Sequence, residues 1–523
     1  MCGIWAYFSK YECKNYQYSI VPKIRGPDST TEITEDNFQL VFHRLAINDT
    51  SREANQPFVF TDPYGFTFYI MCNGEIYNYL DIIKKFEIVT KTRSDCEVLC
   101  YLFQKFWDNP TFISQEIDGE YSIVAMRETP MGRRSILAFR DPFGVRPLYW
   151  CYNESEVFFS SMLGGICKTP EAYTQHFPPG YYVQIDLEHI NQNIPCLFYN
   201  VIKRYKKVSQ DFNYLQEINK SLTNAVAKRI TTTDREVGFF LSGGLDSSLV
   251  VAIASKLTKK PLRTFSIGME NSTDLIHARQ VAKFLHTEHT EVLFTAQEAI
   301  DAIPEVIKCL ETYDITTVRA STPSYLLAKH IRENTNIKVI MNGDGSDEVT
   351  CGYLYNYNAP TPMDAHNDAL RLLKEIHKFD GLRCDRTIAG NSLEARVPFL
   401  DPQFVECYLS IPVELRVPTL ERMEKLMLRD SFKGYLPESV LYRRKEAFSN
   451  GVSGGDQKES MITKIQDWAK SQGTTETLMY LKIFDDLFPN HQHILPHYWM
   501  PKWSGETTDP SATTLNIYKK LNL

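Results

Sequence analysis

The sequence has no run of about 18 apolar residues, so it contains no segment that could form a membrane-spanning helix. Its N-terminus, MCGIWAYFSK, lacks the basic segment and apolar core of a secretory signal. It also lacks an excess of positive charge. The 57 basic and 64 acidic residues give a net charge of −7, which argues against a nucleic-acid-binding surface. These absences predict a cytoplasmic protein without membrane or nucleic-acid partners.

Metal-binding cysteine motifs are absent too. None of the 12 cysteines forms a C-x-x-C pair, and no pair of histidines lies at zinc-ligand spacing near them. In a reducing compartment most of these cysteines should be small buried apolar residues, and only Cys2 stands out by its position. The chain of 523 residues is too long for one ordinary core, and it shows no repeat and no low-complexity linker. We therefore expect two domains that pack directly together.

The pattern of predicted secondary structure changes near residue 200. Before it, short apolar runs at 38–47, 66–72, 122–127, 135–140 and 157–161 predict strands, and helical periodicity is confined to stretches such as 96–106. From residue 212 onward, helical and strand patterns alternate, which predicts a parallel sheet covered by helices. Residues 363–379, 421–432 and 458–470 are also expected to be helical. The predicted domains are 1–200 and 201–523.

Cys2 is a candidate nucleophile. If Met1 is removed, the thiol lies beside a free α-amino group, whose reference pKa of about 7.7–8.0 suits a general base. Asn73 and Gly74 follow a strand, and a side-chain amide beside an exposed backbone N–H could hold an oxyanion. Arg44 could bind an α-carboxylate and Asp95 an α-ammonium group. Each residue taken alone is equally compatible with an ordinary turn or a surface ion pair.

The segment SGGLDSS (242–248) lies between a predicted strand and a predicted helix. Glycines let the backbone approach phosphate oxygens, and the helix N-terminus adds a positive dipole. The lysine of a Walker A motif is missing. Asp246 is acidic where an anion should bind, which makes sense if a cation such as Mg²⁺ intervenes. This pattern predicts a loop of the kind found in enzymes that cleave ATP to AMP and pyrophosphate.

A second acidic loop, NGDGSDE (342–348), follows the predicted strand at 338–341 and lies where ligands bind in open α/β sheets. It could hold a second Mg²⁺ or supply a base, and its spacing excludes an EF-hand. Further candidates are the segments at 311–314, 316–321 and 394–401, and Lys445. A lone lysine is usually only a solvated surface residue, so Lys445 is a candidate site residue because of the motifs that accompany it.

Seven segments of the first half, in order, resemble the class II glutamine amidotransferase domain: CGIW (2–5), RGPD (25–28), HRLAI (43–47), NGEIYNY (73–79), SDCE (94–97), DGEYS (118–122) and RDPFGVRPLYW (140–150). Together with SGGLDSS and the late HYWMPKWSGETTDPSA, the full chain resembles the glutamine-hydrolysing asparagine synthetase family. That resemblance implies an N-terminal-nucleophile hydrolase-like four-layer sandwich. It further implies a parallel-sheet, ATP-pyrophosphatase-like domain with a helical C-terminal part, an α+β then α/β chain.

The resemblance also implies roles for individual residues. Catalysis is assigned to Cys2, Asn73, Gly74, Asp344 and Lys445. Glutamine binding is assigned to Arg44, Leu45, Ala46, Ile47, Asn48, Asn73, Gly74, Glu75 and Asp95. Nucleotide binding is assigned to Leu241, Ser242, Gly243, Gly244, Asp246, Ser247, Ile267, Asn342 and Gly343. Binding of aspartate or its phosphoryl group is assigned to Thr316, Arg319, Asp347 and Lys445. Binding of Mg²⁺ is assigned to Asp246 and Asp347. The implied substrates are glutamine, aspartate and ATP, and a homodimer is left open.

Two departures from the family pattern lie by the second site. Asn342-Gly343-Asp344-Gly345 stands where the family usually has Ser-Gly-Glu-Gly, and Asn450 stands where it usually has aspartate. Three alternatives stay open: a β-lactam synthetase-like enzyme, a glutaminase with an impaired or relic synthetase site, and an amidotransferase acting on a phosphoribosyl or sugar substrate. Cys2 counts against the first, Asp246 and Asp347 against the second, and SGGLDSS against the third.

Overall fold

The computed structural model describes residues 1–12, 16–168, 173–192, 195–200, 213–446, 448–453 and 459–505. The first part of the chain forms two six-stranded antiparallel sheets. The first sheet has the order β10 (Gln175–His176), β8 (Tyr149–Tyr152), β9 (Glu156–Ser160), β1 (Gly3–Ser9), β3 (Phe38–Arg44) and β2 (Ser29–Glu35). The second has the order β12 (Cys196–Leu197), β11 (Tyr181–Asp186), β7 (Arg134–Arg140), β6 (Gly119–Glu128), β5 (Thr67–Ile76) and β4 (Phe58–Thr61).

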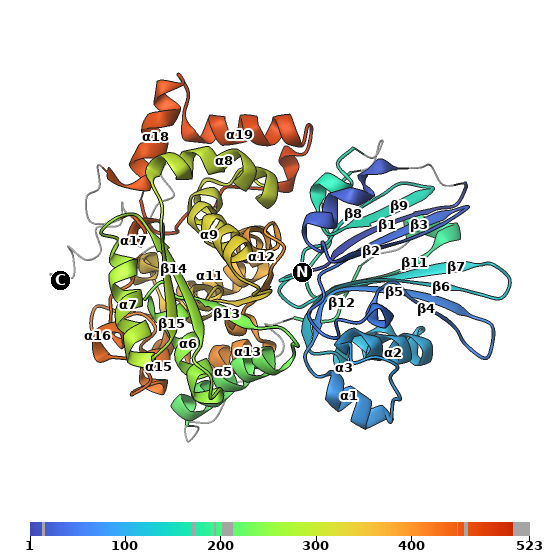
Figure 1. The fold of residues 1–523 in the computed structure, drawn as a ribbon, viewed down its shortest axis with the longest axis horizontal. Helices are drawn as coiled ribbons and strands as arrows, with labels where there is room; N and C mark the ends of the chain where they lie inside the picture. Colours follow the sequence, from blue (N-terminus) through green and yellow to red (C-terminus); the bar gives the residue numbers. More distant parts are fainter. Residues whose placement is uncertain are drawn as a thin grey trace.

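Strand alternation explains how the layers pack. In β1, Ile4, Ala6 and Phe8 belong to the core between the two sheets, whereas Trp5 and Tyr7 face the opposite core. Because successive side chains of a strand point to opposite faces, a continuously apolar strand is buried on both. The outer face of the second sheet is covered by α1 (Tyr79–Phe86), α2 (Val98–Phe106) and α3 (Pro110–Glu116) (Figure 1). This confirms the expected antiparallel, layered first half.

The second part is built on a five-stranded parallel sheet with the order β15 (Glu288–Leu293), β14 (Arg263–Gly268), β13 (Val237–Phe240), β16 (Val339–Met341) and β17 (Glu394–Arg396). Longer helices cover it: α5 (Tyr214–Thr231), α6 (Leu245–Leu257), α7 (Thr273–Leu285), α8 (Ala296–Leu310), α9 (Ile315–Asn334), α11 (Pro362–Glu375), α12 (Asp380–Ala389), α13 (Pro402–Ser410), α18 (Met461–Ser471) and α19 (Glu476–Leu487). Shorter helices are α10 (Ser346–Thr350), α14 (Val413–Arg416), α15 (Leu426–Ser431), α16 (Glu438–Leu441) and α17 (Phe448–Gly451). The predicted parallel sheet with a helical C-terminal part is confirmed.

One predicted helix starts later than expected. Residues 421–432 were expected to be helical throughout, but the helix α15 begins only at Leu426. Lys425 adopts a left-handed conformation with φ of 61°, which interrupts any helix running into it. The consequence is functional, because this turn directs the Lys425 side chain away from the α15 surface and into a polar cavity.

The two parts of the chain lie side by side (Figure 1) and share buried ion pairs. Arg25 donates to Asp385 at 2.7 and 3.0 Å, and both side chains are 1% exposed. Arg229 of α5 likewise bonds Glu120 of β6 at 2.8 Å. Because breaking a buried pair leaves an uncompensated charge, these contacts tie the two halves together. Among the described residues, no helix is both long and apolar enough to cross a membrane.

Two candidate active sites

The first candidate site surrounds Cys2, immediately before β1. The Cys2 thiol lies 3.8 Å from the carbonyl oxygen of Leu45, and the backbone oxygen of Cys2 accepts a hydrogen bond of 2.9 Å from Arg25 Nε. Met1 is still present in this chain and is only 1% exposed. Burial raises the pKa of the Cys2 thiol and lowers the pKa of the Met1 amine to about 6. With Met1 attached, the nitrogen of Cys2 is an amide and cannot act as a base.

Asn73 and Gly74 lie near the end of β5. The Asn73 side chain is fully buried, yet neither its amide nitrogen nor its oxygen has a hydrogen-bond partner among the described residues. Buried polar groups are nearly always paired, so an unpaired buried amide indicates a place for a ligand group. Gly74 has φ of +147°, and a Cβ there would clash with the backbone oxygen of Glu120. Only glycine fits this position.

The segment 44–48 is held rigidly beside Cys2. Arg44 donates to Asn55 at 2.8 Å and to the backbone oxygens of Ser51, Asn48 and Asp49. The Arg44 guanidinium group therefore donates its hydrogen bonds to protein acceptors in this structure. The expected contact with a carboxylate would require some of these hydrogen bonds to break. Leu45 and Ile47 are buried, and the backbone N–H of Ala46 donates to the Asp28 carboxylate at 2.9 Å.

Asn48 connects two buried carboxylates. Its side-chain amide donates to Glu75 at 2.5 Å and to Asp95 at 3.1 Å. Asp95 also accepts the backbone N–H of Ile76 at 2.6 Å. Burial raises the pKa of Asp95, and burial beside Asp95 raises the pKa of Glu75. The structure thus brings together the whole predicted glutamine-binding set, with an acidic pair at one end.

The second candidate site lies at the carboxyl ends of β13 and β16, which are neighbours in the parallel sheet. The loop after β13 leads directly into α6, with Gly244 at its N-cap. Ser242 and Ser247 bond each other through their hydroxyl groups at 3.0 Å. A Cβ on Gly343, in the loop after β16, would lie 2.7 Å from the backbone nitrogen of Ser247. The two predicted loops therefore touch, as expected for adjacent strands of an open α/β sheet.

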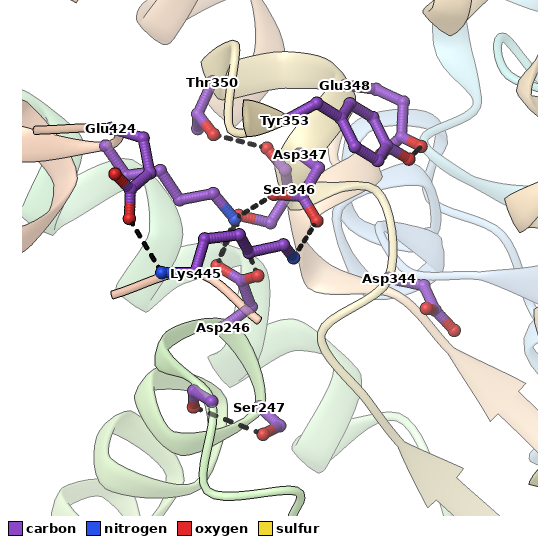
Figure 2. A network of polar contacts seen from close by, with 12 residues as sticks. Asp246, Ser247, Asp344, Ser346, Asp347, Glu348, Thr350, Tyr353, Glu424 and Lys445 are labelled. Atoms are coloured by element: carbon purple, nitrogen blue, oxygen red, sulfur yellow. Dashed lines mark hydrogen bonds and ion pairs between the residues drawn. The ribbon is translucent and has the colours of Figure 1, made fainter. Parts of the chain in front are cut away.

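Two lysines and two aspartates form the charged centre of this site. Lys425 Nζ lies 2.7 Å from Asp246 and 2.6 Å from Asp347, and Lys445 Nζ lies 2.5 Å from Asp347. Figure 2 shows Lys445 directed at Asp347 beside Asp246. Burial alone would raise the pKa of Asp347, but the two ammonium groups hold it well below its usual range. Asp347 is therefore held in its ionised form, and the same pairing raises the pKa of Lys445.

These groups line a cavity of about 270 Å³. Of the predicted nucleotide, aspartate and metal residues, the wall contains Ser242, Gly244, Asp246, Ser247, Thr316, Asn342, Gly343, Asp344, Asp347 and Lys445. Leu241, Gly243, Ile267 and Arg319 are not among the residues that line it. Arg319 instead bonds Glu476 of α19 at 2.8 Å. Its predicted contact with substrate would require that pair to open.

Other sequence candidates lie at the junction of the two halves. Glu311 accepts the backbone N–H groups of Leu163 and Gly164 at 2.7 and 2.8 Å. In the segment 394–401, Glu394 pairs with Arg396 at 2.8 Å, and Asp401 binds Arg229 at 2.9 Å. The Glu311 contacts therefore join the two halves, whereas the pairs formed by Glu394 and Asp401 lie within the second half. The side chain of Asn450 lies outside the described residues, as do residues 506–512 of the late segment.

Sequence reasoning missed Lys425, which connects the two aspartates. It lies 179 residues from Asp246 in the chain, inside a segment that reads as an amphipathic helix. A lone lysine carries no local signal of this role, because both of its partners come from other segments. Within the described ranges, no group of three or more histidine, cysteine, aspartate or glutamate side chains is placed to hold a metal ion.

The unpaired buried amide of Asn73 and the cysteine at position 2, together with a phosphate-type loop and an acid–lysine cavity, are the features of a two-site amide-forming enzyme of the glutamine amidotransferase class. The family model described as "Asparagine synthase" matches residues 217–370 and 360–515, and the model described as "Glutamine amidotransferase domain" matches residues 1–206. The chain belongs to the asparagine synthase family.

Two relatives with similar sequences along nearly the whole chain agree with this assignment. The chain is 39% identical to a "Probable asparagine synthetase [glutamine-hydrolyzing]" of Acanthamoeba polyphaga mimivirus, over 94% of this chain and 95% of that protein. It is 38% identical to the "Asparagine synthetase [glutamine-hydrolyzing]" of Homo sapiens, over 99% of both. A solved glutamine phosphoribosylpyrophosphate amidotransferase from B. subtilis matches 50% of this chain and 65% of its own at 17% identity, with a TM-score of 0.33.

Proposed function

We propose that this protein converts L-aspartate to L-asparagine with ATP, using ammonia released from L-glutamine. The observation that carries the proposal is the union of two sites in one chain. The first half carries Cys2 and the unpaired Asn73 amide, and a separate cavity holds the phosphate-type loop with Asp246 and Lys425. The full-length similarity to glutamine-hydrolysing asparagine synthetases supports the same reading.

In the first reaction, removal of Met1 frees the α-amino group of Cys2 as a base for its own thiol. The thiolate attacks the side-chain carbonyl of glutamine, and the Asn73 amide and Gly74 N–H stabilise the oxyanion that forms. Ammonia leaves, and water releases glutamate from the enzyme. Asp95 and Glu75 offer negative charge for the α-ammonium group of glutamine, and Arg44 offers positive charge for its carboxylate.

In the second reaction, the side-chain carboxylate of aspartate attacks the α-phosphorus of ATP, which forms β-aspartyl-AMP and releases pyrophosphate. Ammonia then attacks the acyl carbon, loses a proton to a base, and displaces AMP. The N-terminus of α6 and the serines of its loop suit the phosphates. Lys425 and Lys445 place two positive charges beside the position where negative charge accumulates. Asp344 is the proposed base.

The remaining residue assignments are part of the same proposal. We assign nucleotide contacts to Leu241, Ser242, Gly243, Gly244, Asp246, Ser247, Ile267, Asn342 and Gly343, and aspartate contacts to Thr316, Arg319 and Asp347. Four of these, Leu241, Gly243, Ile267 and Arg319, lie outside the cavity wall, so their contacts would depend on substrate-induced movement.

Mg²⁺ fits the donor set of the cavity. Asp246 and Asp347 already converge on one cation, the Lys425 ammonium group, at 2.7 and 2.6 Å. Mg²⁺ is usually held by one or two carboxylates, with water and substrate phosphates completing its octahedron. Asp246 and Asp347 would hold the ion, with Lys425 moving toward the phosphates. A bound Mg²⁺ would supply charge neutralisation for the pyrophosphate that departs.

We further propose that residues 1–200 form the glutaminase domain and residues 201–523 the synthetase domain. A cytoplasmic location and a homodimeric assembly are proposed with it. The domain proposal is supported by the change from antiparallel to parallel sheets between β12 and β13.

The proposal is tested by supplying the nitrogen in two ways. The purified protein is incubated with aspartate and MgATP, and either glutamine or an ammonium salt is added. We expect asparagine from both nitrogen sources, and glutamate only with glutamine. Asparagine formation from neither source would overturn the proposed function, and hydrolysis of glutamine alone would indicate a glutaminase.

A further inference from the structure

The strand β17 of the second half lies beside the first candidate site. The amino group of Met1 donates to the backbone oxygen of Leu393, immediately before β17, at 3.4 Å. Within the parallel sheet, β17 pairs with β16, and the carbonyl oxygen of Arg396 accepts the backbone N–H of Asn342 at 3.2 Å. The second half therefore fixes the backbone of Arg396, while the same strand contacts the first half.

The side chain of Arg396 reaches across the junction to the predicted glutamine-binding set. It is fully buried, and its Nη2 atom forms an ion pair of 3.4 Å with the Glu75 carboxylate. Its Nε donates to Glu394 at 2.8 Å, and its Nη1 donates to the backbone oxygen of Arg229 at 2.6 Å. Because the guanidinium group is planar, these two bonds hold the third nitrogen beside Glu75. The same carboxylate accepts the side-chain amide of Asn48 at 2.5 Å.

Arg396 also favours the charged form of Glu75. Burial, reinforced by the negative charges of Asp95 and Glu394, raises the pKa of Glu75. The guanidinium groups of Arg396 and Arg146 act in the opposite direction, with Arg396 ahead of Arg146. Only the ionised carboxylate attracts an ammonium group strongly, so the charge that Glu75 can offer to glutamine depends on this arginine.

We propose that Arg396 is a positioning residue of the glutamine site, which the second half of the chain supplies to the first. This inference rests on the proposed function and deepens it. Arg396 acts through Glu75, which it holds in place and keeps ionised for the α-ammonium group of glutamine. The glutamine site is therefore incomplete within residues 1–200 and is completed only when the two halves are docked.

The test compares Arg396→Gln and Arg396→Lys with Arg416→Gln. Arg416 is the matched control, because it is a buried arginine of the second half that bonds Ile411 and His366 of the same half. For each full-length protein, KM and kcat of glutamine hydrolysis are measured, together with ammonia-dependent asparagine synthesis.

In Arg396→Gln, the KM for glutamine should rise on the order of tenfold, because the binding carboxylate loses its buried partner. The kcat at saturating glutamine should change much less, since the interaction serves binding and not the chemical step. Ammonia-dependent synthesis should stay near the unmodified rate, because the backbone bond from Asn342 to Arg396 is kept. Arg396→Lys keeps the charge without the planar fork, so its KM should lie between those of the unmodified protein and Arg396→Gln. Arg416→Gln should leave the KM unchanged.

A double substitution separates positioning from folding. In a Glu75→Gln background, adding Arg396→Gln should raise the KM for glutamine no further, because the two residues act as one unit. An unmodified KM in Arg396→Gln would overturn the inference, as would a further rise in the double variant or an equal loss of ammonia-dependent synthesis. If instead the unmodified protein does not hydrolyse glutamine, the proposed function itself has failed.

Discussion

Lys425 Nζ lies 2.7 Å from the carboxylate of Asp246, although 179 residues separate them in the chain. The lysine side chain is 2% exposed, and it also contacts Asp347 at 2.6 Å. It therefore joins the first turn of α6 to α10, which follows β16. Together with Lys445, this ammonium group balances the two carboxylates of the second site.

We predict that Lys425→Met lowers ATP-dependent pyrophosphate release by at least about 100-fold with either nitrogen source, because it removes a positive charge beside the phosphates. The variant also leaves two carboxylates facing each other, so its thermal stability should fall. Glutamine hydrolysis should be retained. Lys433→Met is the matched control, because Lys433 is 68% exposed and pairs with Asp430 at the surface. Equal pyrophosphate release by the two variants would contradict the assigned role of Lys425.

We predict that Asp246→Asn strongly reduces pyrophosphate release with glutamine and with ammonia alike. The substitution keeps the shape of the side chain but removes the negative charge that binds Lys425 and that would recruit Mg²⁺. Glutaminase activity should be unchanged, because Asp246 belongs to the second site. Measured at increasing Mg²⁺, the variant should need more metal than the unmodified protein for the same rate. An unaltered Mg²⁺ dependence would argue against the metal role.

The residues of the second site differ in how well the sequence predicts them. The loop at 242–248 was predictable because glycines, serines and a following helix carry their chemistry locally. Lys425 was not, because its meaning comes from two aspartates in distant segments. Arg319 is the opposite case. The family resemblance implied a contact with substrate, but in the structure the Arg319 guanidinium group is bound by Glu476 on α19.

The same contrast holds for the fold. The double-sided burial of β1 follows from its unbroken apolar sequence, and the parallel sheet follows from alternating helix and strand patterns. The start of α15 could not be predicted, because a lysine gives no local signal of the left-handed conformation that Lys425 adopts, with φ of 61°.

We predict that Cys2→Ala abolishes glutamine hydrolysis and glutamine-dependent asparagine synthesis while ammonia-dependent synthesis stays near the unmodified rate. The second site has its own charged groups and does not use the thiol. Cys100→Ala, a substitution on α2 outside both sites, serves as the control for thiol loss. Hydrolysis of glutamine by Cys2→Ala at an unmodified rate would refute the nucleophile assignment.

We predict that Asp344→Glu is neutral or harmful to ammonia-dependent synthesis. Arg383 and Asn342 contact the two oxygens of the shorter acid at 2.7 and 3.0 Å, so a longer side chain must displace at least one of them. The check is the rate of asparagine formation at saturating ammonia. A tenfold or greater rise would mean that the native site is impaired by its aspartate.

The most direct test of the whole account is the stoichiometry of the complete reaction. Glutamine, aspartate and MgATP are supplied together, and asparagine, AMP, pyrophosphate and glutamate are quantified over time. The account predicts that asparagine, AMP and pyrophosphate appear in equal amounts, with glutamate at least equal to asparagine. ADP and phosphate in place of AMP and pyrophosphate, or glutamate without any asparagine, would contradict it.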